Sequence, residues 1–438
     1  MPRTSGEVTV DGILDEVVWQ AAAQIELKYE TNPGDSIPAR VKTIAYLMED
    51  GANLYVGFAA TDPDPSAVRA YLRDRDSAYN DDFVGIYIDT YSDGRRAYAF
   101  LANALGVQTD LIYNEAGGRG FGQQESDAWD VIWDSAGKIN ASGYAVEIKI
   151  PLTQLRFPAA EGLKTWGIEL TRTYPRGKRY RFSNNPNDRN VNCFVCQFGD
   201  MHGLADAEPG RDLEIVPTVT ALQSSTTDDP GIDPLDSQNT SVEAGLNVRW
   251  GVSPDLTVNL AINPDFSQIE ADAAQLDVNN RFALFFPEKR PFFLEGADYF
   301  HTPLQAVFTR TIASPEVGLK LTGKRGNHTF GLITAQDEIT NLVLPEHFSS
   351  GSTTLEQSNT VLIGRYSRGF ENTSSVGALA TIRDGDGYRN IVAGLDARWW
   401  INDQHKIIAQ HLESETEYPL ETALEFDQPL GAFSGSAS

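Results

Sequence analysis

The chain has 438 residues, enough for two or three domains of about 100–200 residues each. Its formal charge of −26 creates a field that repels phosphate backbones, so nucleic acid is a poor candidate partner. Hydrophobic residues make up 41% of the chain, which excludes wholesale disorder, and no apolar run reaches the ~20 residues of a membrane-spanning helix. A membrane β-barrel is not excluded, because its strands hide their apolar face by alternation.

The two cysteines, Cys193 and Cys196, lie in loop sequence rich in Asn and Gly. Two ligands alone make a weak zinc site, and a redox motif would need a strand before it and a helix after it. We therefore expect a loop pair that is either reduced or locally bridged. Residues 1–6 lack the basic and apolar segments of a signal peptide, which indicates either a cytoplasmic protein or a mature or clipped form.

The first part of the chain is predicted to be all-β. Its side chains alternate in polarity over short runs that are separated by turn residues. The clearest hairpin joins residues 82–90 to residues 95–103, because the Asp-Gly pair between them supplies the positive φ that such turns need. Seven or so strands of this kind predict a β-sandwich over residues 1–175. The other predicted strands are 40–48, 54–60, 130–135, 143–150 and 165–173.

Residues 176–210 are rich in Arg, Asn, Pro and Gly and are predicted to be a linker, with the basic run 176–181 as a solvated loop. Beyond it the strands are longer and alternate more cleanly. A soluble sheet could show the same alternation, but segments of ~10 residues, long polar loops and aromatic strand ends favour a partial outer-membrane β-barrel over residues 211–438. The side chains expected to face lipid are Val242, Leu246, Val248, Leu256, Val258, Leu260, Leu395 and Trp399.

Residues 264–315 interrupt this pattern with a stretch that is too long for a turn and too aromatic for a solvated loop. We predict a folded insertion inside a barrel or against the sandwich. Pro287 and Pro291 would fix its bends, and Glu288, Lys289, Arg290 and Glu295 would form ion pairs at its rim. The apolar side chains expected to form one cluster are Phe282, Phe285, Phe286, Phe292, Phe293 and Leu294.

Several motifs resemble known families. Val10–Trp19, Asp82–Asp89, Ala97–Asn103, Trp129–Trp133 and Glu147–Pro151 resemble the carbohydrate-binding module family 9-like sandwich. Asn263–Asp272, Phe285–Gly296 and Leu319–Lys324 are similar to the bacterial family called domain of unknown function 5916.

The resemblance implies an exported Gram-negative protein in which a family 9-like domain precedes an outer-membrane β-barrel. The protein would lie in the outer membrane, with its N-terminal domain periplasmic or surface-exposed. Members are usually longer, so we expect a fragment whose barrel is incomplete.

A sugar site needs aromatic faces for stacking, together with amide and carboxylate groups for the hydroxyls. Trp129 and Trp133 share one face if their segment is extended. The alternative is that both are core residues, and for Trp133 we prefer it. Trp129 follows a Gly-rich loop and is the better stacking candidate. The predicted ligand-binding residues are Trp129, Asp127, Asp130, Trp133 and Asn103.

The same resemblance implies that calcium could be bound. Calcium takes about six to eight oxygen ligands. Asp62, Asp64, Asp81 and Asp82 bracket one loop and are the candidate metal ligands, although solvated loop acids are the commoner explanation.

Catalysis is the weaker interpretation. All 6 histidines lie at or beyond position 202, so the sandwich cannot assemble a triad or a histidine metal site. Glu288 and Glu295 could serve a glycosidase, but the neighbouring Lys289 and Arg290 favour structural ion pairs. We expect capture or uptake of a glycan in carbohydrate catabolism, with the glycan and outer-membrane lipid as partners. The alternatives are a glycoside hydrolase acting on O-glycosyl bonds and a periplasmic or plug domain that binds no sugar.

Overall fold

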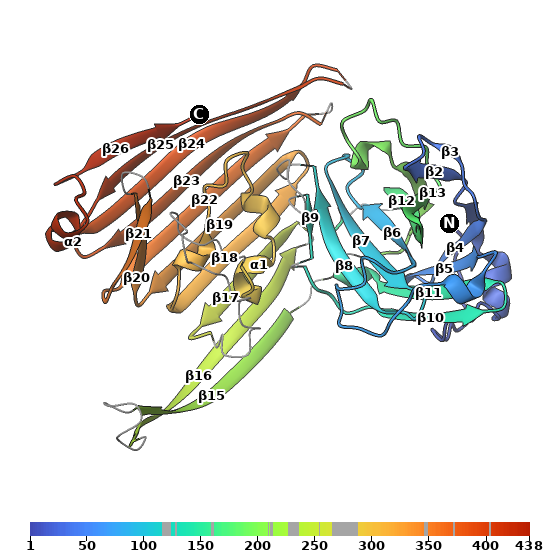
Figure 1. Ribbon diagram of the computed structural model, residues 1–438, viewed down its shortest axis with the longest axis horizontal. Coiled ribbons are helices and arrows are strands. Elements are labelled where there is room, and N and C mark those ends of the chain that lie inside the picture. Colours follow the sequence, from blue (N-terminus) through green and yellow to red (C-terminus); the bar gives the residue numbers. More distant parts are fainter. Residues whose placement is uncertain are drawn as a thin grey trace. The chain divides into compact units, whose positions relative to one another are not determined.

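The structure is a computed structural model in which the chain divides into two compact units (Figure 1). Unit 1 comprises Met1–Arg211 with the short segments Gly369–Ser375 and Ala397–Ile408, and unit 2 comprises Asp212–Arg368, Val376–Asp396 and Ala409–Ser438. The residues described are 1–115, 124–127, 129–158, 162–208, 210, 213–226, 236–253, 255–264, 288–345, 349–370, 373–402 and 404–438.

Unit 1 contains two antiparallel sheets. The five-stranded sheet has the order β1 (Ala23–Glu26), β4 (Thr43–Glu49), β5 (Asn53–Thr61), β11 (Gly143–Pro151), β10 (Asp134–Asn140). The nine-stranded sheet has the order β3 (Ile37–Pro38), β2 (Tyr29–Asn32), β13 (Lys178–Ser183), β12 (Lys164–Arg176), β6 (Phe83–Asp89), β7 (Arg96–Asn103), β8 (Gln108–Asn114), β9 (Glu125–Ser126), with β14 (Gly199–Gly203) also paired to β12.

Buried residues of both sheets meet in one hydrophobic cluster, as in a β-sandwich. The all-β prediction is confirmed for this unit. Short 3₁₀ turns occur at η1 (Val17–Ala21), η2 (Pro65–Ala67), η3 (Leu152–Gln154) and η4 (Val195–Gln197).

The motifs at the two ends of the sandwich sequence meet at one buried carboxylate. Glu147 on β11 is 1% exposed, and its Oε2 accepts the backbone N–H groups of Asp11 and Gly12 at 2.9 and 2.8 Å. The indole N–H of Trp19 donates to Oε1 at 3.1 Å. Three donors therefore satisfy a group that would be costly to bury alone, and they tie the opening segment to the five-stranded sheet.

The segment predicted as a linker differs in the structure. It contains β13, which pairs with both β12 and β2, and β14, which pairs with β12. Residues 178–181 of the basic run thus lie in a strand, where Lys178 and Arg179 stay exposed and the next residue, Phe182, is fully buried. Met201, Leu204 and Ala207 join the same core cluster.

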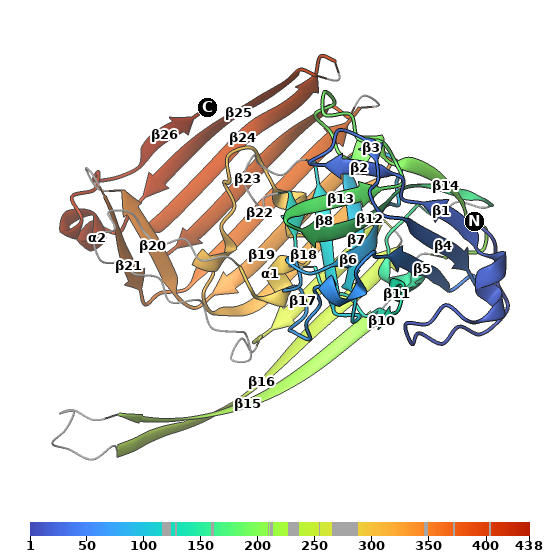
Figure 2. The same cartoon turned by 45° about the vertical axis from the view of Figure 1, so that its right-hand side comes forward.

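Unit 2 is built on a ten-stranded antiparallel sheet (Figure 2). Its order is β15 (Leu213–Thr226), β16 (Asp236–Ser253), β17 (Leu256–Ile262), β18 (Pro315–Arg325), β19 (His328–Asp337), β22 (Asn359–Gly369), β23 (Ser375–Gly385), β24 (Tyr388–Trp400), β25 (Lys406–Glu417), β26 (Phe433–Ala437). A separate hairpin is formed by β20 (Thr340–Pro345) and β21 (Ser350–Leu355), and the helical turns are α1 (Pro291–Leu294), η5 (Ala297–Phe300), η6 (Thr309–Thr311) and α2 (Leu420–Glu425). No helix in the described parts of the chain is both long and apolar enough to cross a bilayer.

The two faces of this sheet have an unusual polarity. On β18, Lys320 is fully buried while its neighbour Leu319 is 38% exposed. On β17, Asn259 is 6% exposed while Ile262 is 40% exposed. We call the face that carries Leu319 the apolar face and the face that carries Lys320 the polar face. The predicted alternation is therefore present, with the polar side chains on the covered side.

Cross-strand register extends both faces across neighbouring strands. On the apolar face, Leu260 pairs with Val248 on one side and Leu319 on the other. On the polar face, Asn259 pairs with Arg249 and Lys320 in the same way. Val242, Leu395 and Trp399, all predicted to face lipid, are 68%, 68% and 46% exposed.

The described part of the insertion covers the polar face. Phe292, Phe293 and Phe300 lie in one buried cluster with sheet residues such as Ile333 and Ile363. Glycines make the close approach possible: a Cβ on Gly331 would lie only 2.6 Å from Cζ of Phe300. Phe282, Phe285, Phe286 and Pro287 lie outside the described residues, whereas Phe292 and Phe293 are 8% and 1% exposed.

The fold predicts which N-terminal fragment of the chain can fold alone. We expect residues 1–208 to fold alone with a cooperative thermal transition, and residues 1–175 to be much less stable. The shorter fragment lacks Phe182, Met201 and Leu204, and burying one large apolar side chain contributes about 1.5–3 kcal/mol. Far-UV circular dichroism with thermal melting of the two fragments is the measurement. Equal melting temperatures would show that β13 and β14 are dispensable.

Candidate functional site

The two tryptophans predicted to stack on sugar lie in the sandwich core. Trp129 is 9% exposed and Trp133 is 3% exposed. The ring centroids of Tyr98 and Phe100 lie 4.8 and 5.7 Å from that of Trp129, and Phe100 is 5.3 Å from Trp133. Trp133 thus lies in the core, the position preferred for it, and Trp129, the better stacking candidate, is buried with it. Alternation places two residues on one face but does not say that the face is solvated.

Asn103 also differs from its predicted role. It is fully buried at the end of β7, where its Oδ1 accepts the N–H groups of Leu105 and Val107, each at 2.9 Å. Its Nδ2 donates to the Tyr71 carbonyl at 3.0 Å and to Asp81 Oδ2 at 2.9 Å. The turn between β7 and β8 uses its carbonyl oxygen, and Tyr71 and Asp81 use its two amide hydrogens, so Asn103 has no free group to present to a ligand.

The candidate calcium ligands are already engaged by protein donors. Arg176 bridges two of them, with Nη2 at 2.7 Å from Asp62 Oδ2 and Nη1 at 2.8 Å from Asp82 Oδ2. Asp81 accepts the Tyr71 N–H and pairs with Arg73 at 3.3 Å.

Asp64, the fourth candidate, caps η2 by accepting the Ser66 N–H at 3.1 Å. A guanidinium thus occupies the position between the buried carboxylates that a cation would take, and these residues do not fit a calcium site. Within the described ranges, no group of three or more His, Cys, Asp or Glu side chains is placed to hold a metal ion.

Asp130 belongs to a second cluster of charges. Arg75 lies 2.9 Å from Asp130, and its Nε donates to the fully buried Asp110 at 2.8 Å. Asp76 lies beside them and accepts the Asp110 N–H at 3.1 Å. Burial, and next the charge of Asp110, raise the pKa of Asp76 to about 7. This carboxyl group therefore titrates near neutral pH, far from its ordinary value.

The outer side of the nine-stranded sheet collects aromatic rings that remain partly exposed. Tyr79, Tyr113, Phe194 and Phe198 pack against a buried cluster that includes Tyr87. Phe194 is central: its ring centroid lies 5.5 Å from Tyr87, 5.1 Å from Tyr113 and 5.0 Å from Phe198. We call these five residues the outer aromatic face.

Charged side chains border the outer aromatic face. The Arg181 guanidinium lies 4.8 Å from the Phe194 ring centroid and 5.4 Å from that of Tyr87. Burial, and then the charges of Asp127 and Glu125, raise the pKa of Tyr79, and Glu125 on β9 pairs with Tyr113 on β8. Asp127, a predicted ligand residue, is exposed and directly follows Ser126 of β9, which pairs with β8 at Ile112.

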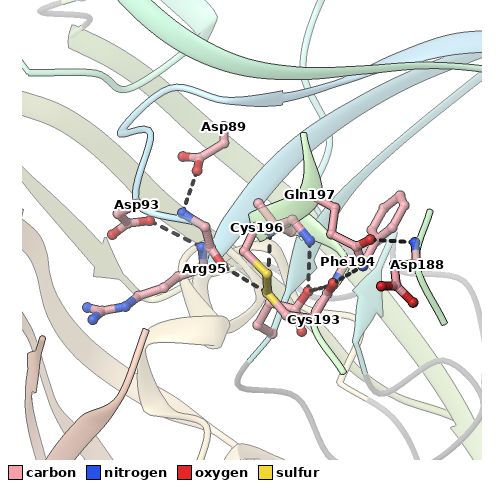
Figure 3. Close-up of a disulfide and its surroundings, with 11 residues drawn as sticks. Asp89, Asp93, Arg95, Asp188, Cys193, Phe194, Cys196 and Gln197 are labelled. Carbon is pink, nitrogen blue, oxygen red and sulfur yellow. Dashed lines mark hydrogen bonds between the residues drawn. A yellow bond between two sulfur atoms is a disulfide. The ribbon is translucent and has the colours of Figure 1, made fainter. Parts of the chain in front are cut away.

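A disulfide loop presents Phe194 (Figure 3). Cys193 and Cys196 are bonded, and the Glu115 carboxylate accepts the N–H groups of Phe194 and Val195 at 2.5 and 2.9 Å. The Gln197 amide donates to the Cys193 carbonyl at 2.6 Å. This network fixes the loop from both ends, so Phe194 is held in place although it lies outside any strand.

The turn between β6 and β7 lies against this loop. Asp89 Oδ2 accepts the Gly94 N–H at 2.8 Å, and Asp93 accepts the Arg95 N–H at 3.3 Å (Figure 3). Cys193 Sγ lies 3.7 Å from the Gly94 carbonyl. The Asp-Gly hairpin predicted from the sequence thus packs against the disulfide loop that carries Phe194.

The carboxylates offered for catalysis are ion-paired on the polar face of unit 2. Arg290 binds Glu288 at 2.7 Å, and Arg249 binds Glu295 at 2.7 Å. Burial alone would raise the pKa of Glu288, but hydrogen bonds from Arg290 and Thr309 and the charge of Arg290 hold it below its ordinary value. The predicted rim pairs are present for Glu288 and Glu295, and such carboxylates act as structural anchors.

Sequence reasoning missed most of the outer aromatic face. Tyr79 and Phe194 lie in loops where no periodicity marks their direction. One signal was available in the sequence. Arg179 and Arg181 are two residues apart, which is the spacing of side chains on one face of a strand. In the structure they pair with Pro175 and Thr173 on β12. Because the basic run was predicted to be a loop, its residues were not assigned to the sheet.

The Asp76 cluster predicts a pH dependence of stability. The folded-state pKa of about 7 lies above the ordinary value of 3.8, so the folded protein holds a proton that the unfolded chain releases between these values. The free energy of unfolding should therefore fall as pH rises from about 4 to 7. Asp76→Asn should remove this contribution and stabilise the protein at pH 8 by on the order of 1–2 kcal/mol, with no gain at pH 4.

Urea unfolding between pH 4 and 8 measures the effect. Asp130→Asn is the matched control, because this side chain faces the same Arg75 but is 69% exposed. The same pH slope for Asp76→Asn and the unmodified protein would contradict the assignment.

Comparison with known proteins agrees with the division into two units. Residues 10–180 match the family described as carbohydrate family 9 binding domain-like, and residues 210–325 match the domain of unknown function 5916. No protein of curated function gives a significant match.

Two solved structures align with part of the chain. One is a family 9 carbohydrate-binding module from Caldicellulosiruptor kristjanssonii in complex with cellotriose, at 20% identity and a TM-score of 0.32, covering 48% of this chain and 93% of that one. The other is a putative carbohydrate-binding protein from Bacteroides uniformis, at 15% identity and a TM-score of 0.35, covering 46% and 96%. The chain is therefore similar to the carbohydrate family 9 binding domain-like family over residues 10–180 and to the domain of unknown function 5916 family over residues 210–325.

Proposed function

We propose that this protein captures a glycan on the outer aromatic face of its sandwich and is held in the bacterial outer membrane by the ten-stranded sheet of unit 2. The sandwich would then lie in the periplasm or at the cell surface. One observation carries the glycan part: partly exposed aromatic rings and charged groups gather on one face of a domain whose family is named for carbohydrate binding.

The chemistry of the outer aromatic face suits a sugar. Aromatic rings offer flat apolar surface for the C–H face of a pyranose, and Arg181, Glu125 and Asp127 offer donors and acceptors for its hydroxyls. Burial raises the pKa of Tyr87 to about 12, and it also raises that of Tyr79 and Tyr113. All three phenols are therefore neutral at physiological pH, and the two partly exposed ones, Tyr79 and Tyr113, can both donate and accept hydrogen bonds.

The polarity of the ten-stranded sheet supports the membrane part of the proposal. In water, an antiparallel sheet buries its apolar face, and here that face is the more exposed one, with Val242 and Leu395 each 68% exposed. The opposite face buries Lys320, Arg365 and Asp337, each with a partner. Apolar outside and polar inside is the arrangement that lipid requires.

The disulfide is consistent with export, because the cytosol keeps thiols reduced. Hydrolysis is less well supported, since Glu288 and Glu295 are each held by an arginine. A sandwich that binds no sugar and serves only as a plug is distinguished by the binding experiment.

If the outer aromatic face captures a glycan, removing its aromatic side chains should weaken glycan binding. Purified full-length protein should bind at least one glycan on an array. Tyr79→Ala/Phe194→Ala should weaken that binding about tenfold or more, because a loss of ~1.5 kcal/mol of ring contact lowers the affinity about tenfold. Tyr46→Ala, which removes a partly buried tyrosine from the five-stranded sheet, is the matched control and should bind normally.

Absence of binding to every glycan would favour the plug interpretation. Release of reducing sugar that Glu288→Gln abolishes would favour the hydrolase instead.

Membrane anchoring predicts a position-dependent cost for charge on the apolar face. Leu260 lies in the middle of β17 between Val248 and Leu319, so Leu260→Arg should destabilise the membrane-inserted protein by ~2–4 kcal/mol if it meets the bilayer midplane. Val252→Arg, near the end of β16, should cost ~0–1 kcal/mol. Unfolding from lipid vesicles provides the measurement, and equal small costs at both positions would argue for a sheet in water.

A further inference from the structure

Unit 2 contains a cavity of about 280 Å³ between the insertion and the polar face of the sheet. Residues 306–308 and Thr311 with Ile312 form one side, and residues of β22, β23 and β24 form the other. The volume is close to the lower end of the ~300–1,000 Å³ range of small-molecule sites. It therefore suits a ligand the size of one sugar ring.

The walls of the cavity combine apolar and neutral polar groups. Val361, Ile363 and Ile312 form an apolar wall, with each side chain at most 5% exposed. Thr381 and Asn390 lie on β23 and β24, the strands that follow β22 in the sheet. Apolar surface with a few convergent polar groups is the usual composition of a ligand site.

The charged groups around the cavity do not favour an ionic ligand. Arg383 is the one charged side chain among the lining residues that the structure describes. Its three nitrogens donate to Asn359 Oδ1 at 3.1 Å, to the Asn341 carbonyl at 2.7 Å and to the Thr311 carbonyl at 3.0 Å, and Asp337 lies 3.7 Å away. Because this guanidinium is already satisfied and balanced, it offers little to an anion, and no carboxylate lines the cavity to hold a cation.

Hydroxyl and amide groups remain for a neutral ligand. The Asn390 Nδ2 donates to Thr416 at 2.8 Å, which directs the amide and leaves its carbonyl oxygen as an acceptor. Over the described ranges, the hydroxyls of Thr381 and Tyr418 have no hydrogen-bond partner. Tyr418 is held by ring contacts with Tyr388 and Phe433 at 6.1 and 5.8 Å, so its hydroxyl is fixed in position.

We propose that this cavity is a second carbohydrate site, which binds one uncharged sugar ring through Asn390, Thr381 and Tyr418 against the apolar wall of Val361 and Ile363. Several hydroxyls on a compact ring match three separated polar groups, and the C–H surface of the ring matches the apolar wall. The site lies wholly within unit 2, so it does not depend on the outer aromatic face.

The experiment uses the purified full-length protein carrying Tyr79→Ala/Phe194→Ala, which removes the proposed sandwich site. Saturation-transfer NMR with glucose, xylose, glucosamine and glucose 6-phosphate should show binding of the two neutral sugars and at least tenfold weaker binding of the two charged ones. Thr381→Val/Tyr418→Phe, which deletes two hydroxyls at nearly constant volume, should weaken the neutral sugars at least tenfold.

The matched control is Thr334→Val/Tyr366→Phe, the same two changes on unit 2 residues outside the cavity lining, and it should change affinity less than twofold. Circular dichroism confirms that each variant is folded. Loss of all monosaccharide binding in the Tyr79→Ala/Phe194→Ala background would overturn the cavity proposal while leaving the sandwich proposal intact. Equal losses of affinity in Thr381→Val/Tyr418→Phe and in Thr334→Val/Tyr366→Phe would also overturn it.

Discussion

The two-residue period of a β-strand is the constraint on which unit 2 depends. Successive side chains point to opposite faces, so a strand with an apolar exposed face must turn its remaining residues inward. In this sheet those inward residues include Lys320 and Arg365, whose charges are costly to bury without partners. Arg365 finds Asp396 on a strand of the same sheet at 2.7 Å, whereas Lys320 donates to the carbonyls of Phe292 and Glu295 in the insertion. The insertion is therefore required by the sheet, because it supplies acceptors that strands alone do not.

This dependence explains which parts of unit 2 could be predicted from the sequence. Alternation along β16, β17 and β24 is a local pattern, and the structure has it with the expected residues on the apolar face. The partners on the polar face are not local: Arg249 and Asn259 reach Glu295 across 46 and 36 positions of sequence. Composition indicated that the aromatic insertion had to pack against something, but it could not indicate which sheet face has the glycines that admit Phe292 and Phe300. Such complementarity is a property of the assembled surface.

In the sandwich, the residues that make the family recognisable are structural ones. Asp11, Gly12 and Trp19 converge on Glu147, and Asn103 closes a turn, so these positions preserve the fold whatever the ligand. The outer aromatic face is built differently, from loop residues such as Tyr79 and Phe194 that the motifs do not include. That is why resemblance indicated the domain type, while Trp129, the better stacking candidate, lies in the core together with Trp133. Motif residues are poor guides to a ligand when the scaffold alone accounts for them.

The contrast between the two sets of carboxylates favours binding over hydrolysis. A glycosidase needs one carboxyl group that keeps its proton near neutral pH and a second one that stays ionised across the scissile bond. Glu288 has the opposite character to a general acid, because Arg290 and Thr309 hold its pKa low. Asp76 has the raised pKa of an acid, but its neighbour Asp110 is fully buried and bound by Arg75, so it cannot reach a substrate. Neither unit pairs an available acid with an available nucleophile among these groups. The two proposed sugar sites rely instead on aromatic rings, hydroxyls and amides, which are groups that can bind a sugar without acid or base chemistry.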